Sequence, residues 1–176
     1  MKIELKNIKV NLAFSEETTM FKADVFVNGK KVAFAENDGH GGCTNISHYE
    51  GMKDTLRQAE AFAKTLPQNK SSLGDKEFSF DNDLEFMVDE MVDDFVNAKE
   101  KVKFEKKLKK AMEKSIVWGK PNGLSFQSWG WKSPIKAILM TPKGIEAVRV
   151  LYNKVKLELK EGEEILNKDL VEMFGK

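Results

Sequence analysis

Apolar and polar residues alternate over the first part of the chain, a pattern that predicts β-strands. In the segment 2–12 the apolar side chains fall at every second position, with one slip at residues 6–7 of the kind that a β-bulge produces. The segments 20–27 and 31–35 flank Asn28-Gly29, a pair that tolerates the positive φ of a two-residue hairpin turn. The pattern predicts a three-stranded antiparallel meander, with one apolar face that another element must cover.

Helical spacing replaces this alternation in two later segments. Residues 49–66 carry apolar side chains three and four positions apart, until Pro67 ends the pattern. A longer helix of about thirty residues, near 45 Å at 1.5 Å per residue, is predicted to begin at a capping Asp81 or Asn82. The polar segment 68–76 between the two helices predicts a loop, and the apolar pair after it predicts a short edge strand.

The longer helix has an apolar arc that is wide over its first turns. One stripe is accompanied by further apolar residues beside it: Leu84, Val88, Met91, Phe95 and Val102 in the stripe, and Met87, Val92 and Val96 next to it. A surplus of this kind must meet another element or another chain. We therefore expect either a contact with the C-terminal helices or a homodimer, with the homodimer favoured.

The C-terminal part combines a hairpin with short helices. Two β-favouring segments bracket the turn residues 120–123. Ser133 and Thr141, each followed by proline, are predicted to cap two helices, and Asn167 to cap a third. The predicted fold class is α+β: an N-terminal three-stranded antiparallel meander, a long central helix, a small β-hairpin and C-terminal helices.

Length and composition fit one domain. A chain of 176 residues with 41% apolar residues can bury a single core, so we expect one domain over residues 1–176. The segment 68–75 is the only seam that the composition offers, and it would separate lobes 1–67 and 76–176. The 29 basic and 28 acidic side chains give a net charge of +1, so the total charge shows no strong nucleic-acid signature.

Cysteine usage and hydropathy predict a protein of the cytoplasm. The single cysteine, Cys43, excludes an intrachain disulfide, and the alternating charges at the start of the chain do not form a secretion signal. No apolar run approaches the roughly 18 residues that a membrane span needs, so no membrane partner is expected.

Charge is divided along the longer helix. Seven acidic residues and no basic ones lie in the segment 81–94, and eight lysines with three glutamates lie in 99–114. This order complements the helix macrodipole and leaves a solvated outer face. The lysine half is alternatively a patch for phosphates or for an acidic partner, an interpretation that the interspersed glutamates weaken.

The segment from Asn37 to Tyr49 is the candidate site, because it holds both histidines, the only cysteine and three glycines. Glycines there let a ligand approach the main chain, and successive amides can form a nest for an anion beside the positive end of the helix expected near Tyr49. The spacing matches neither a Walker A loop nor a dinucleotide fingerprint. The alternative is a glycine-rich connection between strand and helix. The predicted ligand-binding residues are Asn37, Asp38, Gly39, His40, Gly41, Gly42, Thr44, Asn45 and His48.

The cysteine and histidines of this segment permit two further interpretations. His40, Cys43 and His48 have spacings that a zinc site can use, with Asp38 as a fourth ligand. Since no second ligand pair exists elsewhere in the chain, we predict no metal and no cofactor. Cys43 is alternatively a nucleophile with His40 or His48 as its base.

Several segments resemble a group of uncharacterised small phage and prophage proteins that share an N-D-G-x-G-G loop. The resemblance rests on residues 21–32, 35–42, 115–119 and 164–167, and so extends over most of the chain. The group brings no known activity with it. The resemblance implies a phage accessory protein, a class that commonly counters host defence or redirects host enzymes, and it makes the expected cytoplasm that of a host cell.

Three functional hypotheses follow. The first is a non-enzymatic phage accessory protein with an anti-defence role, which binds a small anionic ligand such as a nucleotide, or a host protein, through the Gly-rich loop 37–48. The second is a Cys/His-dependent hydrolase or transferase that uses Cys43. The third is a structural or packaging accessory in which the loop is only a tight turn.

Overall fold

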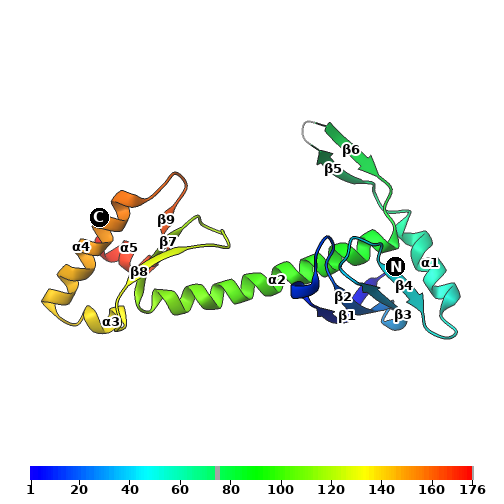
Figure 1. The fold of residues 1–176 in the computed structure, drawn as a ribbon, viewed down its shortest axis with the longest axis horizontal. Helices are drawn as coiled ribbons and strands as arrows, with labels where there is room; N and C mark the ends of the chain where they lie inside the picture. Colours follow the sequence, from blue (N-terminus) through cyan, green and yellow to red (C-terminus); the bar gives the residue numbers. More distant parts are fainter. Residues whose placement is uncertain (74–75, 176) are drawn as a thin grey trace. The chain divides into compact units, whose positions relative to one another are not determined.

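The structure is a computed structural model that describes residues 1–73 and 76–175 (Figure 1). Helices and antiparallel sheets make it an α+β protein, as predicted. The chain divides into two compact units, Met1–Ala98 and Lys99–Lys176. The division falls within the long helix α2 (Leu84–Met112), and not at the predicted seam 68–75.

The N-terminal unit contains a sheet of four strands in the order β1-β2-β3-β4, all antiparallel. Its strands are β1 (Ile3–Val10), β2 (Phe21–Val27), β3 (Lys30–Asn37) and β4 (Asn45–His48), with a short 3-10 helix, η1 (Leu12–Phe14), after β1. The bulge is confirmed by the register shift after Lys6, where Asn7 has φ +55°, and the hairpin turn by the positive φ of Asn28 and Gly29. The predicted number of three strands is wrong. The fourth strand, β4, was missed because its four residues are too few to show alternation.

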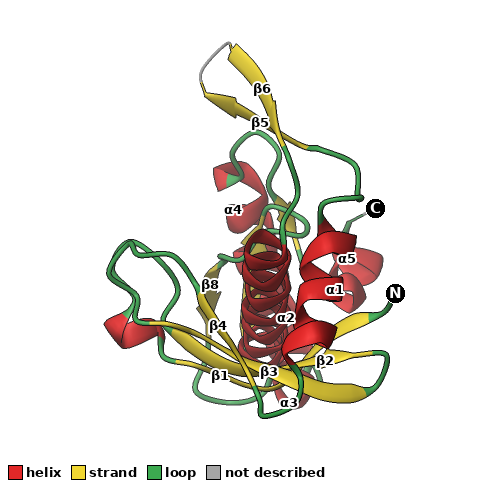
Figure 2. Cartoon of the chain, turned by 90° about the vertical axis from the view of Figure 1, so that its right-hand side faces the viewer, coloured by secondary structure: helices red, strands yellow, loops and turns green. Residues whose placement is uncertain are grey.

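Two helices cover one face of this sheet (Figure 2). They are α1 (Lys53–Ala63) and the first half of α2. The apolar face of the sheet lies in the core beneath these helices. The core contains Phe21, Ala23, Val25, Val27, Val32, Ala33, Ala35, Leu56, Ala59, Ala63, Leu84, Val88 and Val92. The helix α1 begins four residues later than expected, because β4 and a turn occupy the segment before it.

The first turns of α2 differ from the prediction in two respects. The amide of Phe86 donates to Asp83 Oδ1 (2.8 Å), so Asp83 caps the helix in place of Asp81 or Asn82. Val92 is 1% exposed and belongs to the core of the unit. The first turns of the apolar arc are therefore packed against the sheet of their own chain, whereas Val102 further along is 50% exposed, and the homodimer stays a prediction.

A hairpin of β5 (Asn69–Leu73) and β6 (Lys76–Phe80) occupies most of the segment predicted as a loop. That prediction is wrong, although Gly74 and Asp75 lie outside the described residues. The short edge strand predicted from the apolar pair is confirmed as β6, on which Phe78 is 48% exposed. Phe80 packs edge to face on Phe86, at a ring-centroid distance of 5.1 Å.

The C-terminal unit is built around β7 (Ser115–Gly119), the middle strand of a sheet with the order β8-β7-β9. The remaining elements are β8 (Gln127–Gly130), β9 (Glu164–Ile165), α3 (Ile135–Ile138), α4 (Pro142–Glu158) and α5 (Lys168–Phe174). The cap of α4 is confirmed, since Thr141 Oγ1 accepts from the amide of Gly144 (3.1 Å) and Pro142 opens the helix.

Asn167 stands at the N-cap position of α5, but its side chain makes no capping hydrogen bond, so that prediction is wrong. Its side chain is buried, accepts a hydrogen bond from the amide of Val117 (2.7 Å) and donates one to the carbonyl of Ser115 (3.0 Å). It therefore joins the start of α5 to the middle strand of the sheet.

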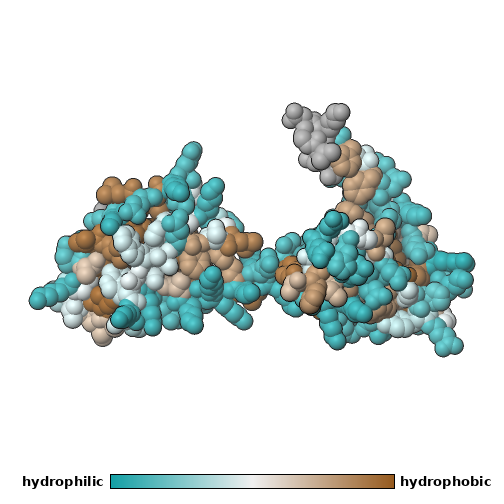
Figure 3. Space-filling model, in the orientation of Figure 1, coloured by the Kyte–Doolittle hydropathy of each residue, from teal (hydrophilic) through white to brown (hydrophobic). Residues whose placement is uncertain are grey.

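On the face that Figure 3 shows, hydrophilic residues predominate and the apolar residues lie in separate areas. Met140 and Leu157, both in the C-terminal unit, are the most exposed of the large apolar side chains described. Within residues 1–73 and 76–175, no helix has both the length and the apolar character that a membrane crossing requires.

Candidate functional site

The Gly-rich loop leaves β3 at Asn37 and is organised around that side chain. Asn37 is 7% exposed, and its Oδ1 accepts hydrogen bonds from the amide of Gly39 (2.9 Å) and the hydroxyl of Thr18 (2.7 Å). Its Nδ2 donates to the carbonyl of Gly42 (2.9 Å) and to the hydroxyl of Thr44 (3.1 Å). One buried amide therefore ties both ends of the loop to the turn that precedes β2.

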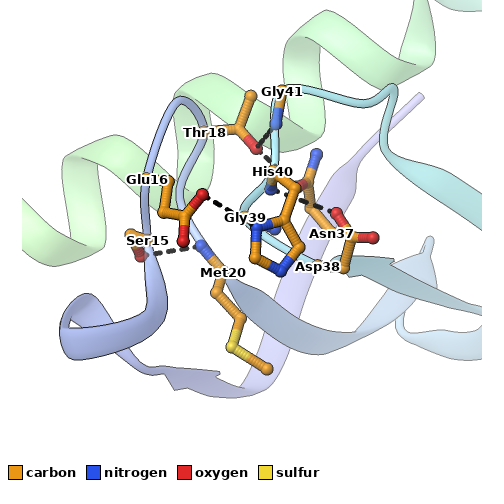
Figure 4. A network of polar contacts seen from close by, with 9 residues as sticks. All are labelled: Ser15, Glu16, Thr18, Met20, Asn37, Asp38, Gly39, His40 and Gly41. Atoms are coloured by element: carbon orange, nitrogen blue, oxygen red, sulfur yellow. Dashed lines mark hydrogen bonds and ion pairs between the residues drawn. The ribbon is translucent and has the colours of Figure 1, made fainter.

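Two glycines of the loop have conformations that other residues rarely adopt (Figure 4). Gly39 has φ +88°, and an added Cβ would lie 2.6 Å from the carbonyl of Phe14. Its own carbonyl accepts the amides of Glu16 (2.9 Å) and Glu17 (3.1 Å). Gly41 has φ +85°, and a Cβ there would meet the carboxylate of Glu17. These glycines serve the packing of the loop against the neighbouring turn.

Three successive amides of the loop are bonded within the protein. The amide of Gly39 donates to Asn37, that of His40 to Asp38 Oδ1 (3.2 Å), and that of Gly41 to Thr18 Oγ1 (3.2 Å). A nest for an anion needs amides that converge on the ligand. Here each of the three amides is already bonded to a different oxygen atom of the protein.

Thr44 connects the end of the loop to the first turns of α2. Its amide donates to Glu85 Oε1 (2.8 Å), and its hydroxyl donates to Asp89 Oδ1 (2.6 Å). Thr44 is 6% exposed, so both bonds are shielded from water on the side of the loop. The acidic half of α2 is thus part of the site.

The potential at this site is negative. Burial raises the pKa of Asp89, and the neighbouring Glu85 and Asp93 raise it further, against the hydrogen bond from Thr44. The charge of Glu85 and a hydrogen bond to it also raise the pKa of the Cys43 thiol. The contributions of Glu85 and Asp93 to these pKa values reflect the negative charge that the carboxylates place beside the loop.

A cleft of about 270 Å³ lies between the loop, the turn before β2 and α2. Three carboxylates line it, those of Glu17, Asp89 and Asp93. Hydroxyl, amide and apolar side chains complete the lining, namely Thr18, Thr19, Asn37, Phe21 and Val92. Its chemistry suits the end of a positively charged side chain with an apolar stem.

The structure does not place the N-terminus of α1 at the loop. The strand β4 runs from Asn45, paired with Glu36, to His48, paired with Ala33, and α1 begins beyond it. The start of α1 therefore lies at the opposite end of the sheet from the loop. The start of the helix that was expected to assist anion binding therefore lies away from the loop, and the helix that does begin beside it, α2, brings the carboxylates of Glu85 and Asp89.

The predicted site residues are only partly brought together. Residues 37–44 form the loop, whereas Asn45 and His48 belong to β4. His40 Nδ1 lies 3.2 Å from a carboxylate oxygen of Glu16, and His48 Nδ1 lies 3.1 Å from the carbonyl of its neighbour Tyr49. The Cys43 thiol is exposed and hydrogen-bonds with Glu85, so each of the three residues has a different partner.

Metal binding finds no support in these positions. Among residues 1–73 and 76–175, no group of three His, Cys, Asp or Glu side chains is arranged to hold a metal ion. His48 is separated from the loop by the length of β4, about 10 Å at 3.3 Å per residue.

Sequence reasoning missed the role of Glu85 and Asp89 at the site. The acidic run in 81–94 was visible, but the macrodipole explained it without reference to the loop. No sequence pattern joins Thr44 to side chains that follow it by 41 and 45 positions.

The comparisons with known proteins come to one finding for this chain. No match appears among models of protein families, among curated proteins or among solved structures.

Proposed function

We propose that this is a non-catalytic binding protein that holds a basic segment of a protein partner against the Gly-rich loop and the acidic half of α2. The resemblance to phage proteins suggests the wider role: a phage accessory protein, with an anti-defence function, whose partner is a host protein. The observation that carries the proposal is the bonding of Thr44 to Glu85 and Asp89, because it sets carboxylates directly beside the loop.

A positively charged partner fits these carboxylates better than a small anion does. Two like charges about 4 Å apart repel by about 4 kcal/mol at the effective dielectric of a protein surface. A phosphate at the loop would meet that repulsion without help from the bonded amides of Gly39, His40 and Gly41. An arginine or lysine in the cleft would instead gain from Glu17, Asp89 and Asp93.

The negative charge of these carboxylates also disfavours catalysis by Cys43. A thiolate nucleophile needs a lowered pKa, which nearby cations or a helix N-terminus supply. Glu85 raises the pKa of this thiol, and neither His40 nor His48 is its hydrogen-bonding partner.

Calorimetry with defined probes tests the proposal. We expect an Arg- and Lys-rich peptide to bind, its citrulline and glutamine version not to bind, and added salt to weaken the interaction. The double variant Glu17→Gln/Asp93→Asn removes two carboxylates of the cleft and should weaken binding by about tenfold.

The matched control is Glu60→Gln/Glu77→Gln, which removes two exposed carboxylates outside the cleft and should leave most of the affinity. Equal losses in the two double variants would mean that only the overall charge of the unit is sensed. Tighter binding of a nucleotide than of any basic peptide would contradict the proposal and favour the small-anion hypothesis.

A further inference from the structure

The sheet of the N-terminal unit has a second face, opposite to α1 and α2 (Figure 2). The strand register identifies its residues, because directly paired residues point to the same side. Core residues Ala23 and Val25 pair with Ala35 and Ala33, so their neighbours along each strand point outward. The rows of this outer face are Glu4, Phe26 and Lys31; Lys6, Asp24 and Phe34; and Lys9, Lys22 and Glu36.

Three aromatic rings on this face each have a lysine over them. The Nζ atoms of Lys6, Lys31 and Lys22 lie 4.4 Å, 4.6 Å and 5.8 Å from the ring centroids of Phe26, Tyr49 and Phe34, respectively. The rings are partly exposed, and the lysines are exposed. Aromatic faces and exposed cations therefore alternate over a few strand positions.

The acidic residues on this face are all paired. Lys2 pairs with Glu4 (2.9 Å), Lys22 with Glu36 (3.1 Å) and Lys31 with Asp24 (2.9 Å). The strand positions Lys6 and Lys9 add positive charge to these pairs. The outer face is thus locally basic, in a unit whose other surfaces carry most of its acids.

The carboxylate at the centre of the face also fixes one of the rings. Asp24 is 8% exposed and accepts hydrogen bonds from Asn7 Nδ2 (2.7 Å) and the hydroxyl of Tyr49 (2.8 Å). These bonds lower the pKa of Asp24, against the effect of its burial, and hold the Tyr49 ring beside the sheet.

We infer that this outer face binds single-stranded nucleic acid, with bases stacked on Phe26, Phe34 and Tyr49 and phosphates bound by the lysines. Aromatic platforms with interleaved cations suit a single strand, because every base offers a π-face and every linkage a phosphate. On binding, a base replaces Lys6 on the Phe26 ring, and the Nζ of Lys6 moves to a phosphate, while Lys22 and Lys31 approach phosphates from their ion pairs with Glu36 and Asp24. A duplex offers the same phosphates without exposed base faces, so the rings favour the single strand.

Fluorescence anisotropy with oligothymidylate of about 12 nucleotides, compared with a duplex of equal length, tests this inference. We expect the single strand to bind at least about tenfold more tightly than the duplex. The double variant Phe26→Leu/Phe34→Leu keeps apolar bulk but removes two stacking faces, and should weaken single-strand binding at least about tenfold. Lys6→Gln should reduce the slope of log affinity against log salt by about 1.

Matched controls separate stacking from other effects. Phe78→Leu changes a half-exposed ring on the β5–β6 hairpin and should leave binding unchanged. Tyr49→Phe keeps the ring, while Tyr49→Leu removes it, so only the second should weaken binding. Thermal unfolding identifies any variant that has lost its fold, and binding by the remaining variants then decides.

Three results would overturn the inference. One is equal affinity for duplex and single strand, which would point to phosphate contacts alone, as the lysine-rich segment 99–114 can make. Another is binding that the Phe26→Leu/Phe34→Leu variant leaves intact. The third is a dimer of the wild-type protein that the same variant dissociates, which would show that a second copy covers this face. Because Glu17 and Asp93 belong to the cleft and not to this face, their variant should not weaken nucleic-acid binding.

Discussion

The two units of the chain carry opposite charge. Residues 1–98 contain 18 acidic and 11 basic side chains, a formal net charge of −7, whereas residues 99–176 contain 10 acidic and 18 basic ones, a net charge of +8. The total of +1 conceals this difference. Partners should therefore be sought separately for an acidic unit and a basic unit.

The units also use buried polar groups in different ways. In the N-terminal unit Asp24, Asn37 and Thr44 are buried and bonded around surfaces to which we assign binding. In the C-terminal unit Asn167 is buried and joins a helix to a strand. Asp24, Asn37 and Thr44 thus lie at the two proposed binding surfaces, whereas Asn167 holds elements of its own unit together.

The largest loss of stability is expected from removing the hydrogen bonds that the Asn167 side chain makes in the C-terminal unit. Asn167→Ala leaves the amide of Val117 and the carbonyl of Ser115 without their side-chain partner, which should destabilise this unit by about 3 kcal/mol. Amide hydrogen exchange should accelerate in β7 and remain slow in β2. The exposed Asn153→Ala on α4 is the control, and equal acceleration in both units would show that they unfold together.

Asn37→Ala is the corresponding change in the N-terminal unit. It removes four hydrogen bonds, but the loop lies nearer to solvent, so we expect a loss of about 2 kcal/mol. Limited proteolysis should cleave the variant between Asn37 and Thr44 before any other site. Resistance equal to that of the wild type would mean that Gly39 alone holds the loop.

Asp24→Asn should destabilise the N-terminal unit by about 1–2 kcal/mol at neutral pH. The substitution places an NH₂ group where an oxygen now accepts from Asn7, Tyr49 or Lys31. Because the pKa of Asp24 is lowered by folding, its contribution is present above the ordinary pKa of an aspartate and is lost as the pH falls through the folded value. Denaturant titrations of both proteins at several pH values should converge at low pH.

Asp89→Asn should have the opposite sign. Folding raises the pKa of Asp89, so its ionised form costs stability above that raised value, and the cost disappears as the pH falls. The Asn oxygen can still accept from Thr44. After screening by solvent, we expect a gain of about 0.5 kcal/mol at neutral pH. A loss in the same denaturant titration would show that the hydrogen bond outweighs the charge repulsion.

The smallest effect concerns the reactivity of a thiol as a probe of each unit. Glu85 raises the pKa of Cys43, so iodoacetamide should label Cys43 more slowly than a free thiol, and Glu85→Gln should increase the rate by about twofold to fivefold. A cysteine introduced at exposed Ser128, in the basic unit, should react faster than Cys43. Equal rates at the two positions would contradict the contrast in potential.

Local chemistry made much of the fold predictable. The Asn28-Gly29 turn, the bulge near Asn7, the Thr141-Pro142 cap and the extent of α2 follow from backbone preferences and spacing within a few residues. The elements that were missed lack such features. The strand β4 has only four residues, and β5 (NKSSL) has a single apolar residue, at its end.

The candidate site was located by its glycines, but its electrostatic character was not. Glycine at positions 39 and 41 indicated an unusual backbone, which the structure explains by positive φ and close packing on the preceding turn. The sign of the potential depends on Glu85 and Asp89, which reach the loop only through tertiary folding. Likewise, Asn167 was predicted to be a helix cap from its place before a helix. Its hydrogen-bonding partners on β7 precede it by about fifty positions, so no local pattern reveals them.

The hairpin turns carry a chemical consequence for the lifetime of the molecule. Asn28-Gly29 and Asn122-Gly123 each place an asparagine with positive φ before a glycine, one in each unit. A small following residue lets the next backbone nitrogen attack the asparagine side chain, and hydrolysis of the resulting succinimide leaves aspartate or isoaspartate. Each such event adds one negative charge, so ageing at both turns would carry the formal charge from +1 to −1. Stored protein should therefore separate into discrete acidic species on isoelectric focusing, and peptide mapping should assign them to these two turns.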